Sequence, residues 1–311
     1  MEVGLPTMNT MLTQLSRLVP AFLYPSLRTL LIRTLQIGPL PGHVGFIMDG
    51  NRRFSRAVGL SVADGHRAGF EALKRILELL LRLNVPHVTV YAFAIGNFKR
   101  SPEEVNKLMD LARTKLVQIC EKGQLLDRYG IRVVVIGRKD LLPADIKASV
   151  ERVEEMTANN KNGCLNVAFP YSSQEEMASA IYTTAQDAIA QHVPAAAIDI
   201  DTIAGNLYTA HSPPLDILIR TSGVSRLSDF LLWQTTLNSS EYARPADPVD
   251  PPEPRQERRK TARGPRRNTT AGASVHFVPK FWPDFGLLDV LPVLLGWQAE
   301  TIIHRFLPFL H

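Results

Sequence analysis

The sequence alternates short, uninterrupted apolar runs with longer segments of helical periodicity, and this alternation constrains the fold more than any other feature. Six runs have the length and composition of strands: 43–48, 88–93, 131–136, 165–169, 216–219 and 275–278. Four segments with apolar residues at helical spacing separate them: 64–83, 102–122, 145–157 and 174–191. Strands joined through such helices run parallel in one sheet, and unbroken apolar runs suit strands that are covered on both faces. The sequence therefore predicts an α/β fold with a central, mostly parallel six-stranded sheet flanked by helices.

Composition argues against several classes of protein. The 311 residues are 45% hydrophobic and carry a net charge of +5. That charge is low for a nucleic-acid-binding protein of this size, so we expect no nucleic-acid partner and favour small anionic ligands or an anionic membrane face. The two cysteines, Cys120 and Cys164, cannot form a disulfide framework, and no Cys/His spacing resembles a zinc site. A reducing compartment is therefore expected.

The first 40 residues differ from the rest of the chain. No run of about 18 uncharged apolar residues occurs, so we expect no conventional transmembrane helix. Residues 11–37 nevertheless combine Leu, Ile, Val and Phe with three arginines and no acidic residue. This pattern is typical of an amphipathic segment on a membrane surface, and it suits a helix packed on the protein's own core equally well. We assign residues 1–40 to an N-terminal amphipathic segment and 41–311 to the main domain.

One segment interrupts that domain. Residues 240–274 contain six prolines, eight Lys or Arg and five Asp or Glu, with no Leu, Ile, Met, Phe or Trp. Such a segment cannot bury enough apolar surface to offset the entropy lost on ordering, so we predict a disordered insertion. Its basic run, 255–267, could contact phospholipid or RNA, but a solvated loop is the simpler interpretation because no aromatic residues lie among the charges.

Two polar segments follow apolar runs directly, and the first is Asp49-Gly50-Asn51-Arg52-Arg53. In parallel α/β sheets, ligands collect beyond the carboxyl ends of the strands. The Asp49 carboxylate suits Mg²⁺, a hard cation that prefers oxygen, and the two guanidinium groups suit phosphate oxygens. A metal-bound diphosphate would fit this segment. Asp-Gly is also a common turn, and taken alone the turn is the simpler interpretation.

The second polar segment, 220–228, follows the run at 216–219 and carries Arg220, Arg226, Ser228 and further hydroxyl groups. Such a loop can bind a second diphosphate, or it can be a surface loop that pairs with acidic residues. Two loops of this kind, each at the carboxyl end of a strand, together favour a paired anion site.

Five ordered segments resemble the signature segments of the cis-prenyltransferase family, which includes bacterial undecaprenyl diphosphate synthase and eukaryotic dehydrodolichyl diphosphate synthase. They lie at 43–54, 65–69, 91–100, 219–234 and 281–285. Their order along the chain makes the resemblance far more specific than any single segment. The Phe-Lys-Arg-Ser and Thr-Ser-Gly sequences are most similar to the eukaryotic dolichol-type catalytic subunit. The resemblance implies a hydrophobic tunnel for the growing chain beside the sheet.

The resemblance also implies a role for each candidate residue. Asp49 would hold Mg²⁺ and assist departure of the allylic diphosphate, with His66 beside it and Asn97 positioning the reacting groups. The diphosphate of the allylic substrate, farnesyl diphosphate, would be bound by Gly50, Asn51, Arg52 and Arg53. Isopentenyl diphosphate would be held by Arg220, Arg226 and Ser228. The apolar side near the reacting carbons would be lined by Phe54, Phe93 and Phe98.

The implied activity is addition of isopentenyl diphosphate to farnesyl diphosphate, giving long-chain polyprenyl diphosphate for dolichol and protein glycosylation. The implied location is the cytosolic face of the endoplasmic reticulum membrane. The chain ends without the Arg-x-Gly that completes the site in the family's accessory subunits, so a Nogo-B-receptor-like accessory subunit is expected as a partner.

Three positions depart from the family pattern, which often has Ser at Ala94 and Glu at Gly96 and Val224. These departures leave a second interpretation open. The chain could be a catalytically weak or inactive paralogue that acts as a binding or scaffolding subunit of the same complex.

Overall fold

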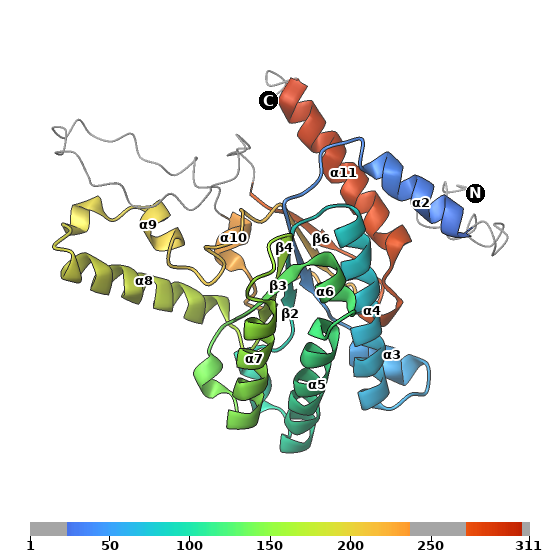
Figure 1. The fold of residues 1–311 in the computed structure, drawn as a ribbon, viewed down its shortest axis with the longest axis horizontal. Coiled ribbons are helices and arrows are strands. Elements are labelled where there is room, and N and C mark those ends of the chain that lie inside the picture. The colour runs from blue at the N-terminus through green and yellow to red at the C-terminus, as the bar shows by residue number, and fades with distance from the viewer. Residues whose placement is uncertain (1–23, 237–271, 307–311) are drawn as a thin grey trace, which may run out of the picture.

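The computed structural model describes residues 24–236 and 272–306, and its centre is one six-stranded parallel sheet with the strand order β3-β4-β2-β1-β5-β6 (Figure 1). The strands are β1 (His43–Ile47), β2 (His87–Tyr91), β3 (Ile131–Ile136), β4 (Gly163–Ala168), β5 (Ile217–Arg220) and β6 (Ser274–Phe277). Every pairing in the sheet is parallel. The prediction of a central six-stranded sheet is therefore confirmed, and each strand lies within two residues of its predicted bounds.

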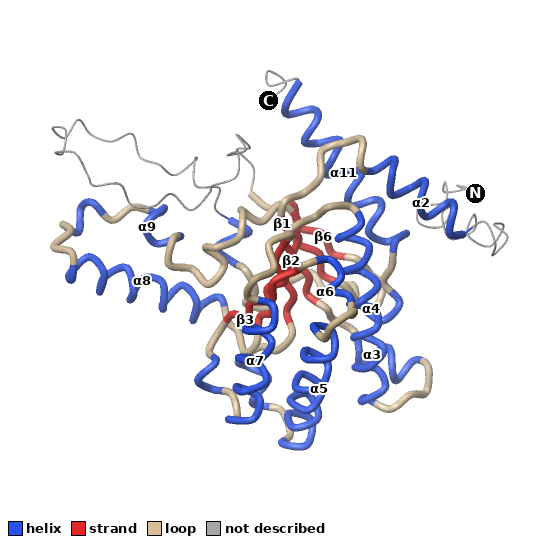
Figure 2. The backbone as a smooth tube through the Cα atoms, in the orientation of Figure 1, coloured by secondary structure: helices blue, strands red, loops and turns tan. Residues whose placement is uncertain are grey.

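Helices surround this sheet, as the tube in Figure 2 shows. The longer helices are α4 (Val62–Arg82), α5 (Pro102–Cys120), α7 (Ala144–Thr157), α8 (Ser173–Ala190) and α11 (Leu287–Phe306). The shorter ones are α2 (Tyr24–Leu35), α3 (Asn51–Ala57), α6 (Leu125–Tyr129), α9 (Ile200–Ala204) and α10 (Leu232–Thr236). Single 3₁₀ turns are η2 (Ile95–Lys99), η3 (Lys139–Leu141), η4 (Ala195–Ala197) and η5 (Trp282–Asp284). The four predicted helices are all present.

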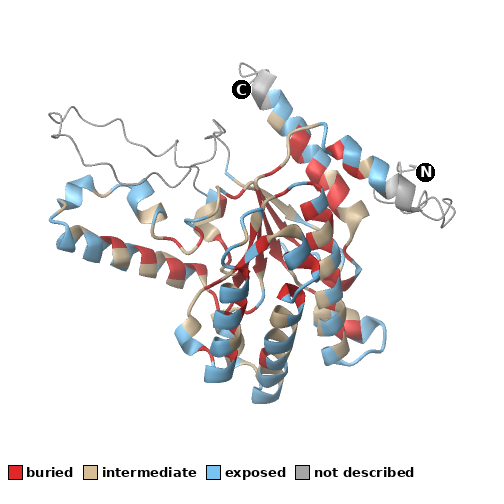
Figure 3. Cartoon of the chain, in the orientation of Figure 1, coloured by how far each residue is buried: buried red, intermediate tan, exposed pale blue. Residues whose placement is uncertain are grey.

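The two faces of the sheet are both buried, which explains the unbroken apolar runs (Figure 3). Alternate strand residues, such as Val44, Phe46 and Val90, join the large core that α4 and α5 cover. A smaller apolar cluster on the other face includes Ile47 and Leu218.

The N-terminal amphipathic segment is described from residue 24 onward, and its α2 packs on the protein's own core. Ile32 and Leu35 are buried in the main cluster. Gln298 of α11 donates hydrogen bonds from its Nε2 to the carbonyl oxygens of Leu35 at 2.7 Å and Pro39 at 2.9 Å. Ile37 is exposed. Core packing therefore accounts for part of the apolar pattern in this segment, and residues 1–23 lie outside the described chain. None of the described helices is long and apolar enough to cross a membrane.

The predicted insertion, 240–274, lies almost entirely outside the described residues, which resume at Gly272. Its predicted end was placed slightly too far along the chain, because Ser274 is the first residue of β6. Gly272 follows the gap directly and lies next to Thr235, two residues before the gap: a Cβ on Gly272 would stand 2.7 Å from the carbonyl oxygen of Thr235.

Candidate active site

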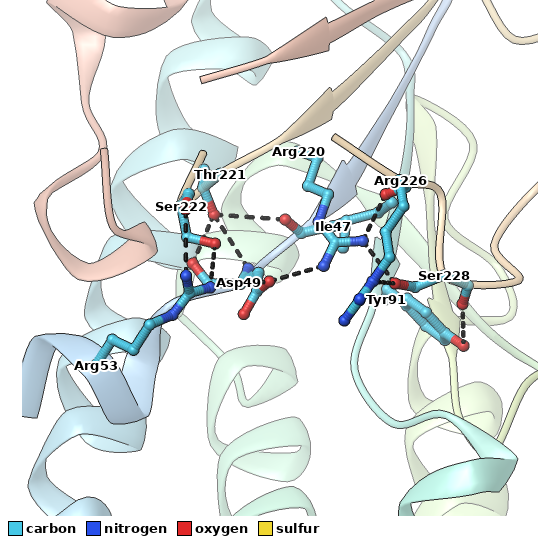
Figure 4. Close-up of polar contacts among 9 residues, drawn as sticks. All are labelled: Ile47, Asp49, Arg53, Tyr91, Arg220, Thr221, Ser222, Arg226 and Ser228. Carbon is cyan, nitrogen blue, oxygen red and sulfur yellow. Dashed lines mark hydrogen bonds and ion pairs between the residues drawn. The ribbon is translucent and has the colours of Figure 1, made fainter. Parts of the chain in front are cut away.

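Both candidate anion loops leave the sheet side by side, because β1 and β5 are neighbours and Ile47 is paired with Arg220. Thr221 joins the two strand ends. Its hydroxyl accepts a hydrogen bond from the backbone N–H of Asp49 at 3.0 Å and donates one to the Asp49 carbonyl oxygen at 2.7 Å. The sheet therefore fixes the separation of the two loops before any ligand binds (Figure 4).

The Asp49 carboxylate lies between arginines from both loops. Its Oδ2 accepts a hydrogen bond from Nη2 of Arg220 at 2.8 Å and lies 3.2 Å from Nη2 of Arg53. Burial alone would raise the pKa of this carboxyl, but the hydrogen bond and charge of Arg220, with the charge of Arg53, lower the pKa below its ordinary value. Asp49 is therefore an anion at neutral pH.

Arg220 connects the two loops. Its side chain is only 4% exposed. Its Nη1 donates to the Ser228 hydroxyl at 2.6 Å and to the Arg226 carbonyl oxygen at 2.5 Å, while Nη2 binds Asp49. Arg226 is exposed, and its Nε donates to the Ser228 hydroxyl at 3.3 Å. The contacts Arg53–Asp49–Arg220–Ser228 form one continuous row, as Figure 4 shows.

The turn after β1 requires glycine at position 50 for two reasons. Gly50 has a φ of 108°, a conformation that L side chains rarely adopt. A Cβ there would also stand 2.9 Å from the Phe281 ring and 3.0 Å from the Ser222 Cβ. The helix α3 starts at the next residue, Asn51, so the backbone N–H groups of its first turn lack intrahelical acceptors. Arg53, in the same first turn, donates from Nη2 to the Ser222 hydroxyl at 2.5 Å.

His66 and Asn97 come from other elements and meet at the same cavity. His66 lies on α4 and Asn97 on η2, and both line the cavity. Burial, followed by the charges of Arg100 and Arg52, lowers the pKa of His66, while Glu104 partly opposes this effect. The imidazole is therefore neutral at pH 7. Its Nε2 is buried without a hydrogen-bond partner among the described residues.

A cavity of about 720 Å³ joins these groups. Eleven of the thirteen predicted site residues line it: Asp49, Gly50, Asn51, Arg52, Arg53, His66, Phe93, Asn97, Arg220, Arg226 and Ser228. Its apolar walls come from α4, α5, β2, β4 and the residue that follows β4, and include Phe70, Leu73, Val90, Leu108, Ala112, Leu116, Ile119, Val167 and Phe169. The cavity therefore has a polar end at the strand termini and an apolar body between the helices and the sheet.

Two predicted apolar contacts are not placed in the lining. Phe54 and Phe98 are absent from the residues that line the cavity in the described chain. Phe98 instead packs edge-on against Phe93, with ring centroids 5.0 Å apart, so it supports the wall from behind. Phe54 is half-buried, and the residues of α3 that line the cavity are Asn51, Arg52, Arg53 and Arg56.

The ligands that this site offers fit a metal ion that is also bound by a diphosphate, and do not fit a metal ion held by protein side chains alone. Within residues 24–236 and 272–306, no group of three or more His, Cys, Asp or Glu side chains could hold a metal ion. Mg²⁺ commonly uses one or two carboxylates and completes its octahedron with phosphate oxygens and water. Asp49 alone, beside groups that attract phosphate, meets that requirement.

Sequence reasoning assigned no role to several residues that shape the site. Glu104 accepts a hydrogen bond from Nη1 of Arg100 at 2.8 Å and lies 3.4 Å from Nη1 of Arg52. Tyr91, the last residue of β2, donates to the Ser228 carbonyl oxygen at 3.3 Å. Tyr91 could have been found from its place at a strand's carboxyl end. Glu104 could not, because an acid in the first turn of a helix is expected for helix stability alone.

Comparisons with known proteins agree with this geometry. A family profile described as "Putative undecaprenyl diphosphate synthase" matches residues 47–245. A dehydrodolichyl diphosphate synthase complex subunit of Schizosaccharomyces pombe is 36% identical over 275 residues, covering 88% of this chain and 91% of that protein. The human dehydrodolichyl diphosphate synthase complex subunit is 42% identical over 202 residues, covering 65% of this chain and 61% of the human protein. The crystal structure of lavandulyl diphosphate synthase from Lavandula x intermedia, in complex with dimethylallyl diphosphate, matches with a TM-score of 0.66 at 26% identity, over 84% of this chain and 96% of that one.

The chain therefore belongs to the undecaprenyl diphosphate synthase family, that is, to the cis-prenyltransferases. It is a prenyl-transferring enzyme of the kind that synthesises cis-prenyl chains.

Proposed function

We propose that this chain adds isopentenyl diphosphate to farnesyl diphosphate and so makes a long-chain dehydrodolichyl or polyprenyl diphosphate. The observation that carries the proposal is the row Arg53–Asp49–Arg220–Ser228, which joins two anion-ready loops at the polar end of a mostly apolar cavity. The reaction needs two diphosphates side by side and a dry space for the hydrocarbon chain. The names of the fission yeast and human relatives point to the same kind of product.

The first loop would take the allylic substrate. The backbone N–H groups at the start of α3, together with Arg52 and Arg53, face the polar end of the cavity and would bind the leaving diphosphate. Breaking the allylic C–O bond transfers negative charge to that diphosphate. Groups that already point at it stabilise the transition state more than the ground state, which is what accelerates the reaction.

The second loop would take isopentenyl diphosphate. Arg226 is exposed at the cavity, and Ser228 lies between it and Arg220. Two anions placed next to each other repel, so positive charge on both loops is needed to bring the reacting carbons together. Asn97 would orient the two substrates, and neutral His66 would lie beside the leaving group without adding charge.

Mg²⁺ would be held by Asp49 together with diphosphate oxygens, and when bound it supplies positive charge that stabilises the leaving diphosphate. The ionised state of Asp49, which Arg220 and Arg53 maintain, prepares the chain for that ion. Phe93 and the apolar walls behind it would exclude water from the reacting carbons and so protect a carbocation-like centre from hydrolysis. The body of the cavity between α4 and α5 would form the start of a tunnel for the growing chain.

We further propose that the chain works as the catalytic member of a heteromer with a Nogo-B-receptor-like accessory subunit. The complex would act at the cytosolic face of the endoplasmic reticulum membrane and supply dolichol for protein glycosylation. The relatives named as subunits of a complex support this proposal.

Reconstitution tests the proposal. The chain is co-expressed with a Nogo-B-receptor-like subunit and given labelled isopentenyl diphosphate, farnesyl diphosphate and Mg²⁺, with Asp49→Asn as the inactive control. We expect labelled polyprenyl diphosphate that disappears when the metal is chelated. Complete absence of product, both from the intact chain and from one that lacks 240–271, would favour a scaffolding paralogue. The departures from the family pattern at Ala94, Gly96 and Val224 would then account for the lost activity.

A further inference from the structure

The loop after β5 contains most of the unusual backbone conformations in the described chain. Among the described residues, six that are not glycine have a positive φ. Four of these six lie in this loop: Ser222 (79°), Ser228 (52°), Asp229 (59°) and Leu231 (48°). L residues are strained in this region, and such residues persist only where their surroundings hold them. The loop therefore needs an external support.

The strained part of the loop presents the groups assigned above to isopentenyl diphosphate. The Ser228 hydroxyl accepts hydrogen bonds from both Arg220 and Arg226, and the backbone at Ser228 has a positive φ. Tyr91 fixes the other side of the turn by donating to the Ser228 carbonyl oxygen at 3.3 Å, and its ring stacks on Phe230 with centroids 4.4 Å apart.

The support comes from the beginning of α8. The Asp229 carboxylate accepts two hydrogen bonds there: Oδ1 from the backbone N–H of Gln174 at 3.0 Å, and Oδ2 from the Ser172 hydroxyl at 2.5 Å. The backbone is joined at the same place, since the N–H of Ser173 donates to the Asp229 carbonyl oxygen at 2.9 Å. Leu232 then donates its N–H to the Ser173 hydroxyl at 2.8 Å. Four hydrogen bonds thus fasten a strained turn to one helix end.

We propose that Asp229 is a positioning residue for the isopentenyl diphosphate subsite: its carboxylate, bound to the start of α8, keeps Ser228 and Arg226 in the conformation that receives the diphosphate. Asp229 does not line the cavity, so it acts through its neighbours and does not touch the ligand. The proposal rests on the proposed function for the identity of the ligand. The competing explanation is that position 229 only needs a residue that tolerates a left-handed backbone, as Asp does.

Two substitutions separate these explanations. Asp229→Gly permits the backbone conformation without strain but removes the carboxylate. Asp229→Asn retains an oxygen that accepts from Gln174 and also tolerates the conformation. For each variant, amide hydrogen exchange is measured over 224–231 in the protein alone. Calorimetry then gives the affinity for isopentenyl diphosphate alone and for farnesyl diphosphate alone, with Mg²⁺.

We expect Asp229→Gly to exchange about tenfold faster over 224–231 and to bind isopentenyl diphosphate about tenfold more weakly, on the scale of one charged hydrogen bond. Its affinity for farnesyl diphosphate should stay within about twofold, and Asp229→Asn should lie near the wild type in both measurements. The matched control is Asn84→Gly, which places glycine at a positive φ of 60° outside the cavity lining. It should change neither the exchange rate over 224–231 nor the affinity for isopentenyl diphosphate. If Asp229→Gly does not fold, Ser172→Gly removes one of the two bonds at the carboxylate while keeping a tolerable helix cap, and a smaller effect of the same kind is expected.

An Asp229→Gly variant with wild-type exchange and wild-type affinity for isopentenyl diphosphate would overturn the proposal. Faster exchange without weaker binding would also overturn the proposal, because Asp229 would then support the turn without affecting the affinity for isopentenyl diphosphate. If the wild-type protein itself binds no isopentenyl diphosphate, the proposed function fails. The exchange measurement still decides in that case whether Asp229 supports the turn.

Discussion

The carboxylate of Asp49 contacts both anion loops, since it pairs with Arg220 from one and with Arg53 from the other. We therefore expect Asp49→Asn to lower kcat by about 10²-fold or more, the scale of losing one preorganised electrostatic group, about 3 kcal/mol. Folding should largely persist because Asn has nearly the same shape. Single-turnover formation of the first condensation product measures the effect. A loss smaller than about fivefold would show that Asp49 is mainly structural.

Individual site residues were predictable from sequence where they follow a strand directly. Asp49 and Arg220 are examples, because parallel topology alone brings the carboxyl ends of neighbouring strands together. Phe54 and Phe98 were not, since the direction in which a side chain leaves a short helix or a 3₁₀ turn depends on packing that no local pattern encodes. The proposed role of Asp229 could not be predicted from sequence either, because it depends on contacts with Ser172 and Gln174, which are more than 50 residues away.

At the scale of elements, α5 forms one wall of the cavity, and Ala112 is its smallest lining side chain. Ala112→Phe should fill part of the apolar body and shorten the polyprenyl products, while the first additions of isopentenyl diphosphate continue. The exposed neighbour Thr114 provides a matched control, because Thr114→Phe adds a similar ring outside the cavity. Mass spectrometry of the products gives the chain-length distribution. An unchanged distribution for Ala112→Phe would mean that the chain grows elsewhere.

A second prediction at this scale concerns the segment 237–271. Thr235, two residues before this segment, lies next to Gly272, which follows it directly. Because the two ends already meet, a short Gly-Ser link can replace the segment without moving β6, and closing a shorter loop costs less entropy. We expect the thermal midpoint to stay within about 5 °C of the intact chain. Limited proteolysis of the intact chain should cut first between Glu241 and Gly272. Resistance of this segment to protease would contradict the predicted disorder.

For the molecule as a whole, the sequence predicted the sheet better than the elements around it. The six strands could be recognised because the sheet is buried on both faces, which produces unbroken apolar runs. The helix α11 lacks the amphipathic pattern that identifies surface helices, and Pro292 lies within it. Nothing local in the sequence indicates that α11 and α2 pair through Gln298. The helix α11 and its contact with α2 were therefore not predicted.

A buried polar network on the sheet face opposite α4 and α5 also has consequences for the whole molecule. His43 binds the Pro213 carbonyl oxygen through Nδ1 at 2.9 Å and the Thr89 hydroxyl through Nε2 at 2.7 Å. Asn166 donates to Thr89 at 3.0 Å, and its Oδ1 accepts from His211 at 2.8 Å. Because a carbonyl oxygen only accepts, Nδ1 of His43 carries the proton and Nε2 accepts from Thr89. A second proton on His43 would break this arrangement.

Burial lowers the pKa of His43 to about 4, with a smaller contribution from the charges of His87 and His211. The unfolded chain, with an ordinary histidine pKa of about 6.5, then binds more protons than the folded one between these values, so stability falls as the pH drops through that window. Between pH 7 and pH 5, His43 alone should remove about 2 kcal/mol from the free energy of unfolding in urea. His43→Gln should reduce this pH dependence even if it lowers stability at pH 7, whereas the exposed His192→Asn should leave it unchanged. An equal loss in His43→Gln and in the wild type would show that other groups, such as paired carboxylates, cause the acid sensitivity.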